Sequence, residues 1–321
     1  MFTFRCVTAA ALAASTVGAA QAQTYPAKPV RIVVPFAAGG PADVYARILG
    51  RHLQEALGQS FVIEDRPGGG SVVGSDVVAK SPPDGYTLLM MSNTHTVNES
   101  LLPKKPFVLM RDFAPISPVN YSDLVLVIHP SVRIDSIKQL VATAKAKPRV
   151  LNYASSGPGT PYHMAGELFK FMAQVDIVHV PYKGSSGARN DVLGGQIEMM
   201  FDAITTMAPN VQSGRVKALA TTGRARSSVL PNVPTVDEAG VPGYDAVIWL
   251  GVMAPANTPK TVIDRLNAEI GKVLARADLR DAWRKQGAET MAMTPEKFGE
   301  FLRADIGKWA KVVKAAGIKV D

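Results

Sequence analysis

Two Gly-rich turns, each leading from an apolar strand into a helix, are the segments of this chain best suited to binding chemistry. The first is Phe36–Asp43 (FAAGGPAD) and the second is Ser155–Pro161 (SSGPGTP). Proline suits the first position of a helix, and the first N–H groups of a helix have no acceptor within it. A carboxylate or phosphate can bind to such free N–H groups. Two such turns in one chain predict two lobes that hold one small anion between them.

The binding hypothesis assigns a role to groups of both turns. N–H groups of residues 38–42 would face a carboxylate from one lobe, and those of residues 156–160, with neighbouring hydroxyls, would face it from the other. The predicted site residues of the two turns are Phe36, Ala38, Gly39, Gly40, Asp43, Ser155, Ser156, Gly157 and Thr160. Ordinary helix capping, with Thr160 as the N-cap residue, is the alternative. Because the Asp43 carboxylate would repel an anion, we expect it to cap backbone groups behind the ligand.

Polar residues after other expected strands are further candidates, because α/β sheets place ligands at the carboxyl ends of their strands. Ser92 and Asn93 follow the third expected strand, and Tyr182 and Asp202 follow two later ones. Asp202 could contact an amino or hydroxyl group of a ligand, or it could cap the next helix. Lys183 could pair with a second acid group of the ligand or be solvated.

His163 and two aromatic residues have two interpretations each. His163 lies near Ser155 in sequence and four residues before Glu167, so it could contact the ligand or take part in acid–base chemistry. The alternative is that His163 packs and hydrogen-bonds to a neighbouring loop. Phe36 and Trp249 could form apolar walls of a pocket, or they could belong to the core.

Motifs for other chemistry are missing from the sequence. Neither nucleotide motif, G-x-G-x-x-G before a helix or G-x-x-x-x-G-K-[ST], occurs, and Gly70–Gly74 has the wrong spacing for a G-x-S-x-G nucleophile turn. His52, His95, His129 and His179 show no paired ligand spacing, so no metal site is indicated. We therefore expect no metal and no other cofactor.

The composition is that of a folded protein, and its basic charge suits nucleic acid, an anionic membrane surface or an anionic ligand. The chain has 321 residues, of which 47% are hydrophobic and 19% charged, which is sufficient for two lobes with cores. Its formal net charge is +8, but the Lys and Arg residues are scattered, without runs or interleaved aromatic residues. The charge therefore favours a small anion over nucleic acid.

The N-terminus has the pattern of an export signal. Arg5 gives a positive start, Val7–Ala20 is apolar or small, and Ala20-Gln21-Ala22 fits a cleavage site. The apolar stretch is too short to span a membrane. Cys6 is the one cysteine in the sequence and lies in this signal, so the mature chain would have no disulfide. We expect a periplasmic protein without stable membrane insertion, cleaved near Ala22.

Strands and helices are expected to alternate along most of the chain, which predicts α/β architecture with mainly parallel sheets. Phe113–Val119 and Leu124–Ile128 are two apolar runs separated by a polar tip. Three expected helices, at 259–275, 279–286 and 295–316, follow the last strand and must cover a sheet that already exists, most economically that of the first lobe.

The chain is expected to cross between the lobes twice, near Tyr121–Leu124 and near Ala246–Gly251, and two crossings make a hinge. The predicted organisation is a signal at residues 1–22, a first lobe of residues 23–122 plus 248–321, and a second lobe of residues 123–247. A freely hinging binding protein suggests a monomer.

Motifs along the whole mature chain resemble the extracytoplasmic solute-binding receptors of tripartite tricarboxylate transporters, called Bug receptors. The matching segments are Tyr25-Pro26, Val30–Pro35, Phe36–Arg47, Glu64–Gly70, Pro83–Thr87, Tyr153–Gly159, His163–Phe169, His179–Gly184, Gly194–Gln196 and Leu230–Gly240. Many members have proline at the position of Ala38 and threonine at that of Ala42. This chain therefore lacks a hydroxyl that could cap the first helix or contact the ligand.

The resemblance implies an α/β fold of the type II periplasmic-binding-protein class, with two lobes joined by two crossing strands that close on the ligand. It implies a small organic acid as ligand, namely a di- or tricarboxylate, an acidic amino acid or an aromatic acid. In the family, backbone groups and ordered waters typically hold one carboxylate between the loops that match Phe36–Asp43 and Ser155–Thr160. The implied partners are membrane subunits of a tripartite tricarboxylate-type transporter, and no enzymatic activity is implied.

Two other functions stay open at this point. One is an exported hydrolase that uses His163 with a nearby serine. The other is a receptor whose liganded form reports to a membrane sensor kinase.

Overall fold

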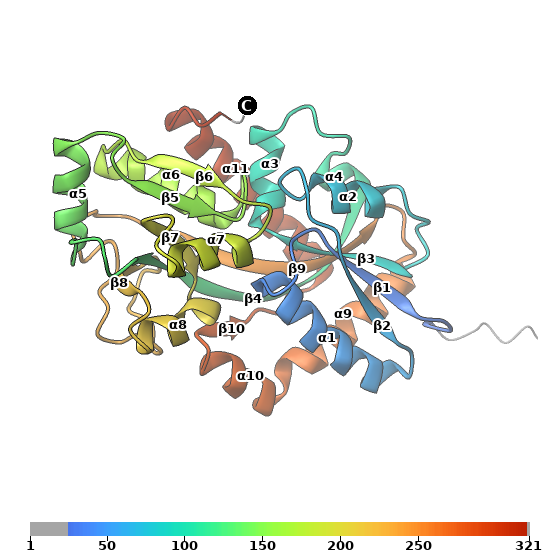
Figure 1. Cartoon of the computed structure of the whole chain (residues 1–321). Helices are drawn as coiled ribbons and strands as arrows, with labels where there is room; N and C mark the ends of the chain where they lie inside the picture. Colours follow the sequence, from blue (N-terminus) through green and yellow to red (C-terminus); the bar gives the residue numbers. More distant parts are fainter. Residues whose placement is uncertain (1–24, 320–321) are drawn as a thin grey trace, which may run out of the picture.

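The computed structural model describes residues 25–319, and the predicted signal at residues 1–22 lies outside them (Figure 1). The strands are β1 (Val30–Val34), β2 (Phe61–Asp65), β3 (Thr87–Ser92), β4 (Phe113–Ile128), β5 (Asn152–Ser155), β6 (Val178–Pro181), β7 (Met199–Ala203), β8 (Lys217–Thr221), β9 (Val247–Pro255) and β10 (Ala288–Thr290). The helices are α1 (Pro41–Leu57), α2 (Val72–Ala79), α3 (Asn93–Leu101), α4 (Leu109–Asp112), α5 (Ile137–Ala146), α6 (Pro161–Ala173), α7 (Ser185–Leu193), α8 (Ile204–Gln212), α9 (Lys260–Ala275), α10 (Ala277–Arg284) and α11 (Pro295–Ala315). None of the helices in residues 25–319 is long and apolar enough to cross a membrane.

The strands form one continuous sheet in the order β2-β1-β3-β9-β4-β7-β5-β6, and β8 and β10 also pair with β4. At its two ends the strands run parallel, β1 with β2 and β3, and β5 with β6 and β7. Within the described part of the chain, every antiparallel pair involves β4 or β9. The expectation of mainly parallel sheets is therefore correct for the two ends and wrong for the middle.

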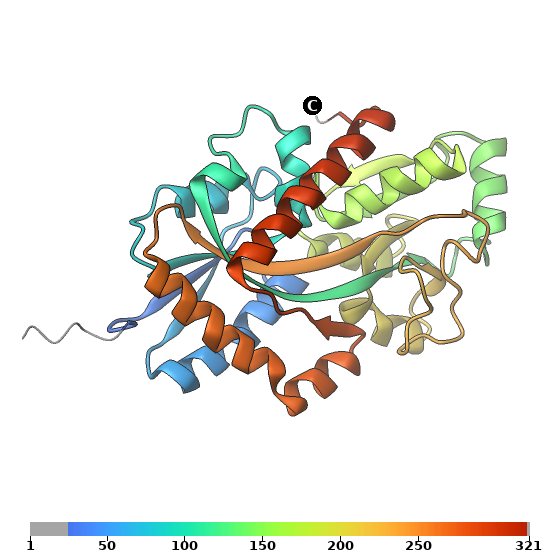
Figure 2. The same cartoon turned by 180° about the vertical axis from the view of Figure 1, so that it is seen from behind.

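β4 is a single strand of 16 residues, where the sequence suggested two runs separated by a polar tip. Its residues from Phe113 to Asp123 pair with β9, and those from Leu124 to Ile128 pair with β7 and β8. The polar residues at the expected tip keep a strand backbone because β9 and β10 pair with them from both sides. β4 and β9 thus pass together from one half of the sheet to the other, as both views show (Figures 1 and 2).

Each half of the sheet has its own buried cores, and we call the two halves with their helices the first and second lobes. In the first lobe, α1, α9 and α10 pack on one face and α2 and α11 on the other. In the second lobe, α5 and α6 pack on one face and α7 and α8 on the other. Figure 2 shows α11 lying across β4 and β9. The three last helices therefore cover the sheet of the first lobe.

The boundaries predicted at residues 122/123 and 247/248 fall within the paired stretch of β4 and β9, at Asp123 and Val247. Ile248, which was assigned to the first lobe, packs in a core of the second lobe. The core of the chain is thus divided near these positions, and the division into domains stays a prediction.

The helix α3 has no counterpart among the expected elements, because most of its buried side chains are polar and only Val97 and Leu101 are apolar. Ser92 is its N-cap residue, and the Ser92 hydroxyl accepts the N–H of Thr94 at 3.2 Å. The Ser92 N–H donates to Nδ1 of His95 at 3.2 Å, and the Thr96 hydroxyl donates to the Asp305 carboxylate at 2.6 Å. A helix buried through such contacts lacks the apolar periodicity that marks most helices in a sequence.

Candidate functional site

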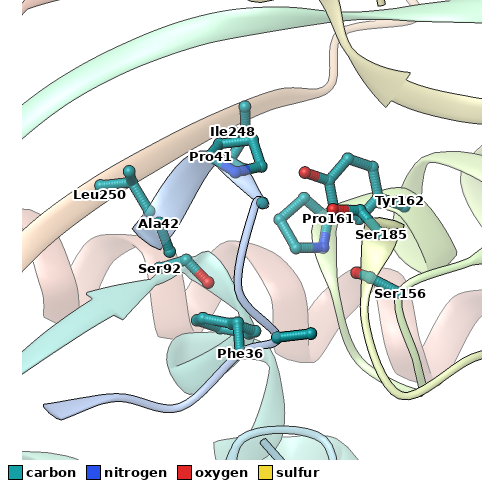
Figure 3. Close-up of a pocket in the computed structure, with 12 residues that line it drawn as sticks. Phe36, Pro41, Ala42, Ser92, Ser156, Pro161, Tyr162, Ser185, Ile248 and Leu250 are labelled. Carbon is teal, nitrogen blue, oxygen red and sulfur yellow. The ribbon is translucent and has the colours of Figure 1, made fainter. Parts of the chain in front are cut away.

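A narrow pocket lies between the lobes at the point where the two predicted turns meet, and we call it the inner pocket. It contains about 330 Å³ of unfilled space when its open mouth is counted, but its enclosed part has room for only about one water molecule. Its walls are Phe36, Ala37, Gly40, Pro41, Ala42, Ser92, Ser156, Pro161, Tyr162, Ser185, Ile248 and Leu250 (Figure 3). Helix α1 begins at Pro41 and helix α6 at Pro161, so both helices start at this pocket.

The start of α1 leaves two backbone donors free. Gly40 is the N-cap residue and has no side chain to cap the helix. The N–H of Gly39 donates to Oδ2 of Asp43 at 2.8 Å, and Oδ1 of Asp43 pairs with Arg47 at 2.5 Å. No hydrogen bond among residues 25–319 takes up the N–H groups of Ala42 and Asp43. The Asp43 side chain thus caps the turn and is not itself a wall of the pocket.

At the start of α6, several of the expected donors are already used inside the turn. The N–H of Gly157 donates to Oγ of Ser155 at 3.1 Å, and that of Gly159 donates to Nδ1 of His163 at 3.0 Å. The N–H of Thr160 donates to the Gly157 carbonyl at 3.3 Å, and the Thr160 hydroxyl caps the helix by accepting the His163 N–H. The expectation that residues 156–160 all present free N–H groups is therefore wrong for Gly157, Gly159 and Thr160.

Ser156 and Tyr162 supply the donors that remain on this side. Within the described residues, their N–H groups take part in no hydrogen bond, and the Ser156 hydroxyl has no partner. The Tyr162 hydroxyl has no partner in good hydrogen-bond geometry, and the Ser185 side chain lies beside it (Figure 3). Both residues are buried, with 8% of Ser156 and 4% of Tyr162 exposed. Burial raises the pKa of Tyr162, so its hydroxyl keeps its proton and can donate. Because buried polar atoms rarely lack a partner, these hydroxyls favour a polar ligand group in the pocket.

The rest of the wall is apolar. Side chains alternate along a strand, so Ile248 and Leu250 of β9 face the pocket and Trp249 faces the opposite side. Trp249 packs against Phe301 with ring centroids 5.1 Å apart, in a core of the first lobe. Trp249 therefore belongs to the core, whereas Phe36 forms part of the pocket wall. None of the lining side chains is charged, so an anion here would be held by N–H and hydroxyl donors.

The side chains of Ser92, Asn93 and Asp202 all have partners within the protein, and of the three only Ser92 lines the pocket. Ser92 lines the pocket, but its hydroxyl also caps α3. The Asn93 amide donates to the Val247 carbonyl at 3.0 Å and so joins α3 to the start of β9. The Asp202 carboxylate is fully buried and pairs with Arg189 at 2.6 Å. Sequence reasoning missed Arg189, because nothing in the sequence pairs it with a residue on another element.

His163 belongs to a buried stack of rings behind the pocket. Its ring lies on that of His179 with centroids 4.1 Å apart, and His179 lies on Tyr153 at 5.0 Å. Burial lowers the pKa of His163 to about 4 and that of His179 to about 3. Nδ1 of His163 accepts the Gly159 N–H, so the ring helps to shape the second turn. His163 is therefore packed inside the protein and hydrogen-bonded to the second turn, as the alternative interpretation of this residue states.

The serine–histidine pair beside the second turn is Ser155 with His179, whose Oγ and Nε2 are 2.6 Å apart. Ser155 is fully buried and neither residue lines the pocket. A substrate in the inner pocket would therefore not reach the Ser155 hydroxyl in this arrangement. Among the described residues, no group of three His, Cys, Asp or Glu side chains is placed to hold a metal ion.

A second cavity continues from the inner pocket, and we call it the outer cavity. The two share Phe36 and Ser156. Gly157, Thr160 and Tyr182, three of the predicted site residues, line the outer cavity and not the inner pocket. The Tyr182 hydroxyl donates to Asp191 at 2.5 Å.

The lobes touch each other at the rim of the inner pocket, where Ala38 and Gly39 lie. The Ser186 hydroxyl donates to the Ala38 carbonyl at 2.9 Å. Gly184 lies so close to the first turn that a Cβ at this position would be 2.3 Å from the Cβ of Ala37. These contacts join the start of α7 to the first turn and close this side of the pocket.

The predicted site residues are thus distributed over several places. The inner pocket is lined by Phe36, Gly40, Ser92 and Ser156, and Ala38, Gly39 and Asp43 surround the first turn. Asn93, Ser155, His163 and Asp202 lie behind the walls. Tyr162, Ile248 and Leu250 were missed as contacts, although the alternation of side chains along β9 could have indicated the last two.

Comparisons with known proteins show the family and the fold of the chain. The sequence model of the family described as tripartite tricarboxylate transporter family receptor matches residues 45–318. Protein BugT of Bordetella pertussis is 39% identical over 301 residues, which are 93% of this chain and 92% of BugT. The structure of R. palustris Rpa4515 with adipate has a TM-score of 0.89 at 34% identity, covering 92% of this chain and 99% of that one. The structure of the periplasmic binding protein BugD has a TM-score of 0.88 at 34% identity, covering 92% and 99%.

Proposed function

The chain belongs to the tripartite tricarboxylate transporter receptor family, and we propose that it captures a small organic carboxylate in the periplasm for a membrane transporter. Its fold is the type II periplasmic-binding-protein fold of this family. One observation carries the proposal. Two helix starts from opposite lobes meet at one uncharged pocket, and the second lobe adds the buried hydroxyls of Ser156 and Tyr162 (Figure 3).

Both sides of this pocket can donate to one carboxylate. The free N–H group of Ala42, which lines the pocket, lies on the first-lobe side, and the N–H and hydroxyl groups of Ser156 and Tyr162 lie on the other. Free N–H groups at a helix start carry partial positive charge, so the site binds an anion without a cationic side chain. The apolar side chains of the wall would hold the body of the acid. That Rpa4515 was solved with adipate supports a carboxylate.

The proposed role is binding and not catalysis. The relatives are solute-binding receptors, and the hydrolase alternative has no histidine at the pocket wall to activate a serine. The export-type N-terminal sequence and a hinge formed by two crossing strands support delivery in the periplasm. A ligand that binds the closed form better shifts the lobes towards closure, and the closed form is what the transporter subunits would recognise.

Thermal unfolding with matched acids and amides tests the proposal. The protein is first unfolded and refolded to remove bound ligand, and Tm is then measured with adipate, succinate, glutamate and benzoate. Adipamide and benzamide serve as uncharged controls of similar shape. An acid present at about 100 times its Kd stabilises by about 2.7 kcal/mol, which raises Tm by about 5–10 °C. If no acid raises Tm, or if each amide acts as strongly as its acid, the proposal is wrong.

Three variants locate the site. Ser156→Ala and Tyr162→Phe each remove one hydroxyl without a partner, so we expect about ten-fold weaker binding with Tm of the free protein little changed. Ser228→Ala is the matched control, because Ser228 is exposed and lies outside the inner pocket. If Ser156→Ala and Tyr162→Phe bind the acid as tightly as Ser228→Ala does, the ligand binds elsewhere.

A further inference from the structure

Helix α11 carries an exposed basic face that lies away from the ligand pocket. Its exposed cations, which we call the basic face, are Lys297, Arg303, Lys308, Lys311 and Lys314. Among residues 25–319, none of them forms an ion pair. The acid in the second half of the helix, Asp305, accepts the hydroxyl of buried Thr96 at 2.6 Å and does not neutralise them. The face therefore presents several uncompensated positive charges.

The neighbouring helix α9 shows the ordinary arrangement of surface charge in this protein. Lys260 pairs with Asp264 of the same helix at 2.7 Å. Arg265 and Lys272 both pair with Glu269, at 3.3 Å and 3.0 Å. Residues three or four apart on a helix are neighbours, so like charges at this spacing repel each other. The lysines at 308, 311 and 314 have this spacing without an acid between them, which favours an acidic partner over a plainly solvated surface.

A groove runs beside the first turns of the same helix. It lies between α9 and α11 on the side of the molecule that Figure 2 shows, and it contains about 1370 Å³ of unfilled space, open to solvent. Met293 and Phe301 are half-buried in its wall, and Gly271 and Ala304 line it with little side-chain bulk. Because Lys297 belongs to both the groove and the basic face, the two surfaces are continuous.

This combined surface suits a protein segment better than a membrane. It is one helix wide, and the 21 residues of α11 extend over about 30 Å. A Cβ at Gly307, between the cations, would meet nothing within 4 Å, so another backbone can approach closely there. Among the described residues, none of the large apolar side chains that are exposed lies on α11, so the helix has no such group to insert into lipid.

We propose that α11 and the groove beside it bind an acidic, amphipathic segment of a partner protein. Apolar side chains of the segment fill the groove, and its carboxylates lie on the basic face. The inference goes beyond the proposed function, because it requires no ligand in the pocket. Trp309 and Val313 pack in one cluster with Val97 of α3 and with Met164 of α6, which belongs to the second lobe. A partner on α11 therefore contacts a helix that touches both lobes (Figure 2).

Two helical peptides of identical composition test this inference on the full chain by fluorescence anisotropy. The first peptide has its glutamates along one side and its leucines at one end of the same side, and the second has the same residues scattered around the helix. At about 150 mM salt, where isolated surface charges are largely screened, we expect the first to bind about ten-fold more tightly.

Variants with matched loss of charge locate the contact. The test variant combines Lys308→Gln, Lys311→Gln and Lys314→Gln, and the control removes three exposed lysines of α5 by Lys138→Gln, Lys145→Gln and Lys147→Gln. The test variant should bind the first peptide about ten-fold more weakly, and the control should bind it as the unchanged protein does. Ala304→Glu, which places a bulky negative group where the groove meets the basic face, should weaken binding as well.

The outcomes decide between the occupants. The proposal is wrong if neither peptide binds, if both bind equally, or if the α11 and α5 variants lose the same affinity. It is also wrong if vesicles of phosphatidylcholine with phosphatidylserine bind the unchanged protein but not the α11 variant, while neither peptide binds. Tm of each variant shows that the fold is intact. Titration of the α11 variant with organic acids tests the proposed function separately, because the substituted lysines lie outside the inner pocket.

Discussion

Closure of the lobes depends on a glycine at position 184, and its replacement by alanine should weaken ligand binding. Gly184 has φ 170°, an extended conformation that alanine adopts without strain. Its added Cβ would lie 2.3 Å from the Ala37 Cβ, where ordinary contact begins at 3.4 Å, so the two segments must move apart by about 1 Å. Overpacking of this kind costs about 1–3 kcal/mol, which corresponds to about five- to 150-fold weaker binding. The cost falls on the closed form, because the two residues belong to different lobes.

The assay is calorimetric titration of Gly184→Ala with the acid that raises Tm most in the panel. Gly187→Ala is the matched control, because its Cβ would meet only Tyr182 at an ordinary 3.4 Å. Ala37→Gly in the Gly184→Ala background removes the opposing Cβ and should restore most of the affinity, and Ala37→Gly alone completes the cycle. Unchanged affinity of Gly184→Ala, or failure of the double variant to recover, would refute the reasoning that this contact forms on closure.

Three further predictions concern buried charge. Burial raises the pKa of Asp123 to about 6, so the free energy of unfolding should fall as pH rises from about 4 to about 6. In urea unfolding, Asp123→Asn should lack this fall and be about 1–3 kcal/mol more stable than the unchanged protein at pH 8. Burial lowers the pKa of His163 and His179 to about 4 and about 3, so the unfolded chain takes up protons first and stability is lost as pH falls from about 6.5 towards 4. Replacing His179 by Gln should reduce that slope by about 1.4 kcal/mol per pH unit, and an unchanged slope would contradict the assignment. Arg189→Leu leaves the Asp202 carboxylate buried without its partner and should cost about 3–5 kcal/mol in urea unfolding, while Arg189→Leu combined with Asp202→Asn should recover most of it.

The sequence predicts well what local signals determine. Pro41 and Pro161 mark helix starts after glycine turns, and the structure begins α1 and α6 at these residues. The family and the fold class are confirmed by the comparisons. The last helices were expected to follow without further strands and to cover an existing sheet, and they do pack on the first lobe. The expectation was wrong for β10, a strand of three residues between α10 and α11 that pairs with β4. Such features depend on short-range patterns that a reader of the sequence can see.

The details that depend on side-chain direction could not be predicted in the same way. Whether Gly157 and Gly159 offer free N–H groups depends on the Ser155 hydroxyl and the His163 ring, which turn back to accept them. α3 was missed because buried polar contacts, such as that of Thr96 with Asp305, replace an apolar face. The first two contacts are local in sequence but depend on side-chain rotamers, and the third joins residues 209 positions apart that only the folded chain brings together.

The pairing of β4 with β9 through the crossing limits how the lobes can move. Asp123 and Val247 are register partners at the point where both strands leave the first lobe, so the two connections between the lobes form one hydrogen-bonded ribbon. A paired ribbon bends and twists but resists sliding of one strand along the other. Gly223–Ser228 of the second lobe and Arg284–Glu289 of the first line a groove beside the ribbon. Fluorophores on these two segments should therefore report the bending of the ribbon as a change in their separation when ligand binds.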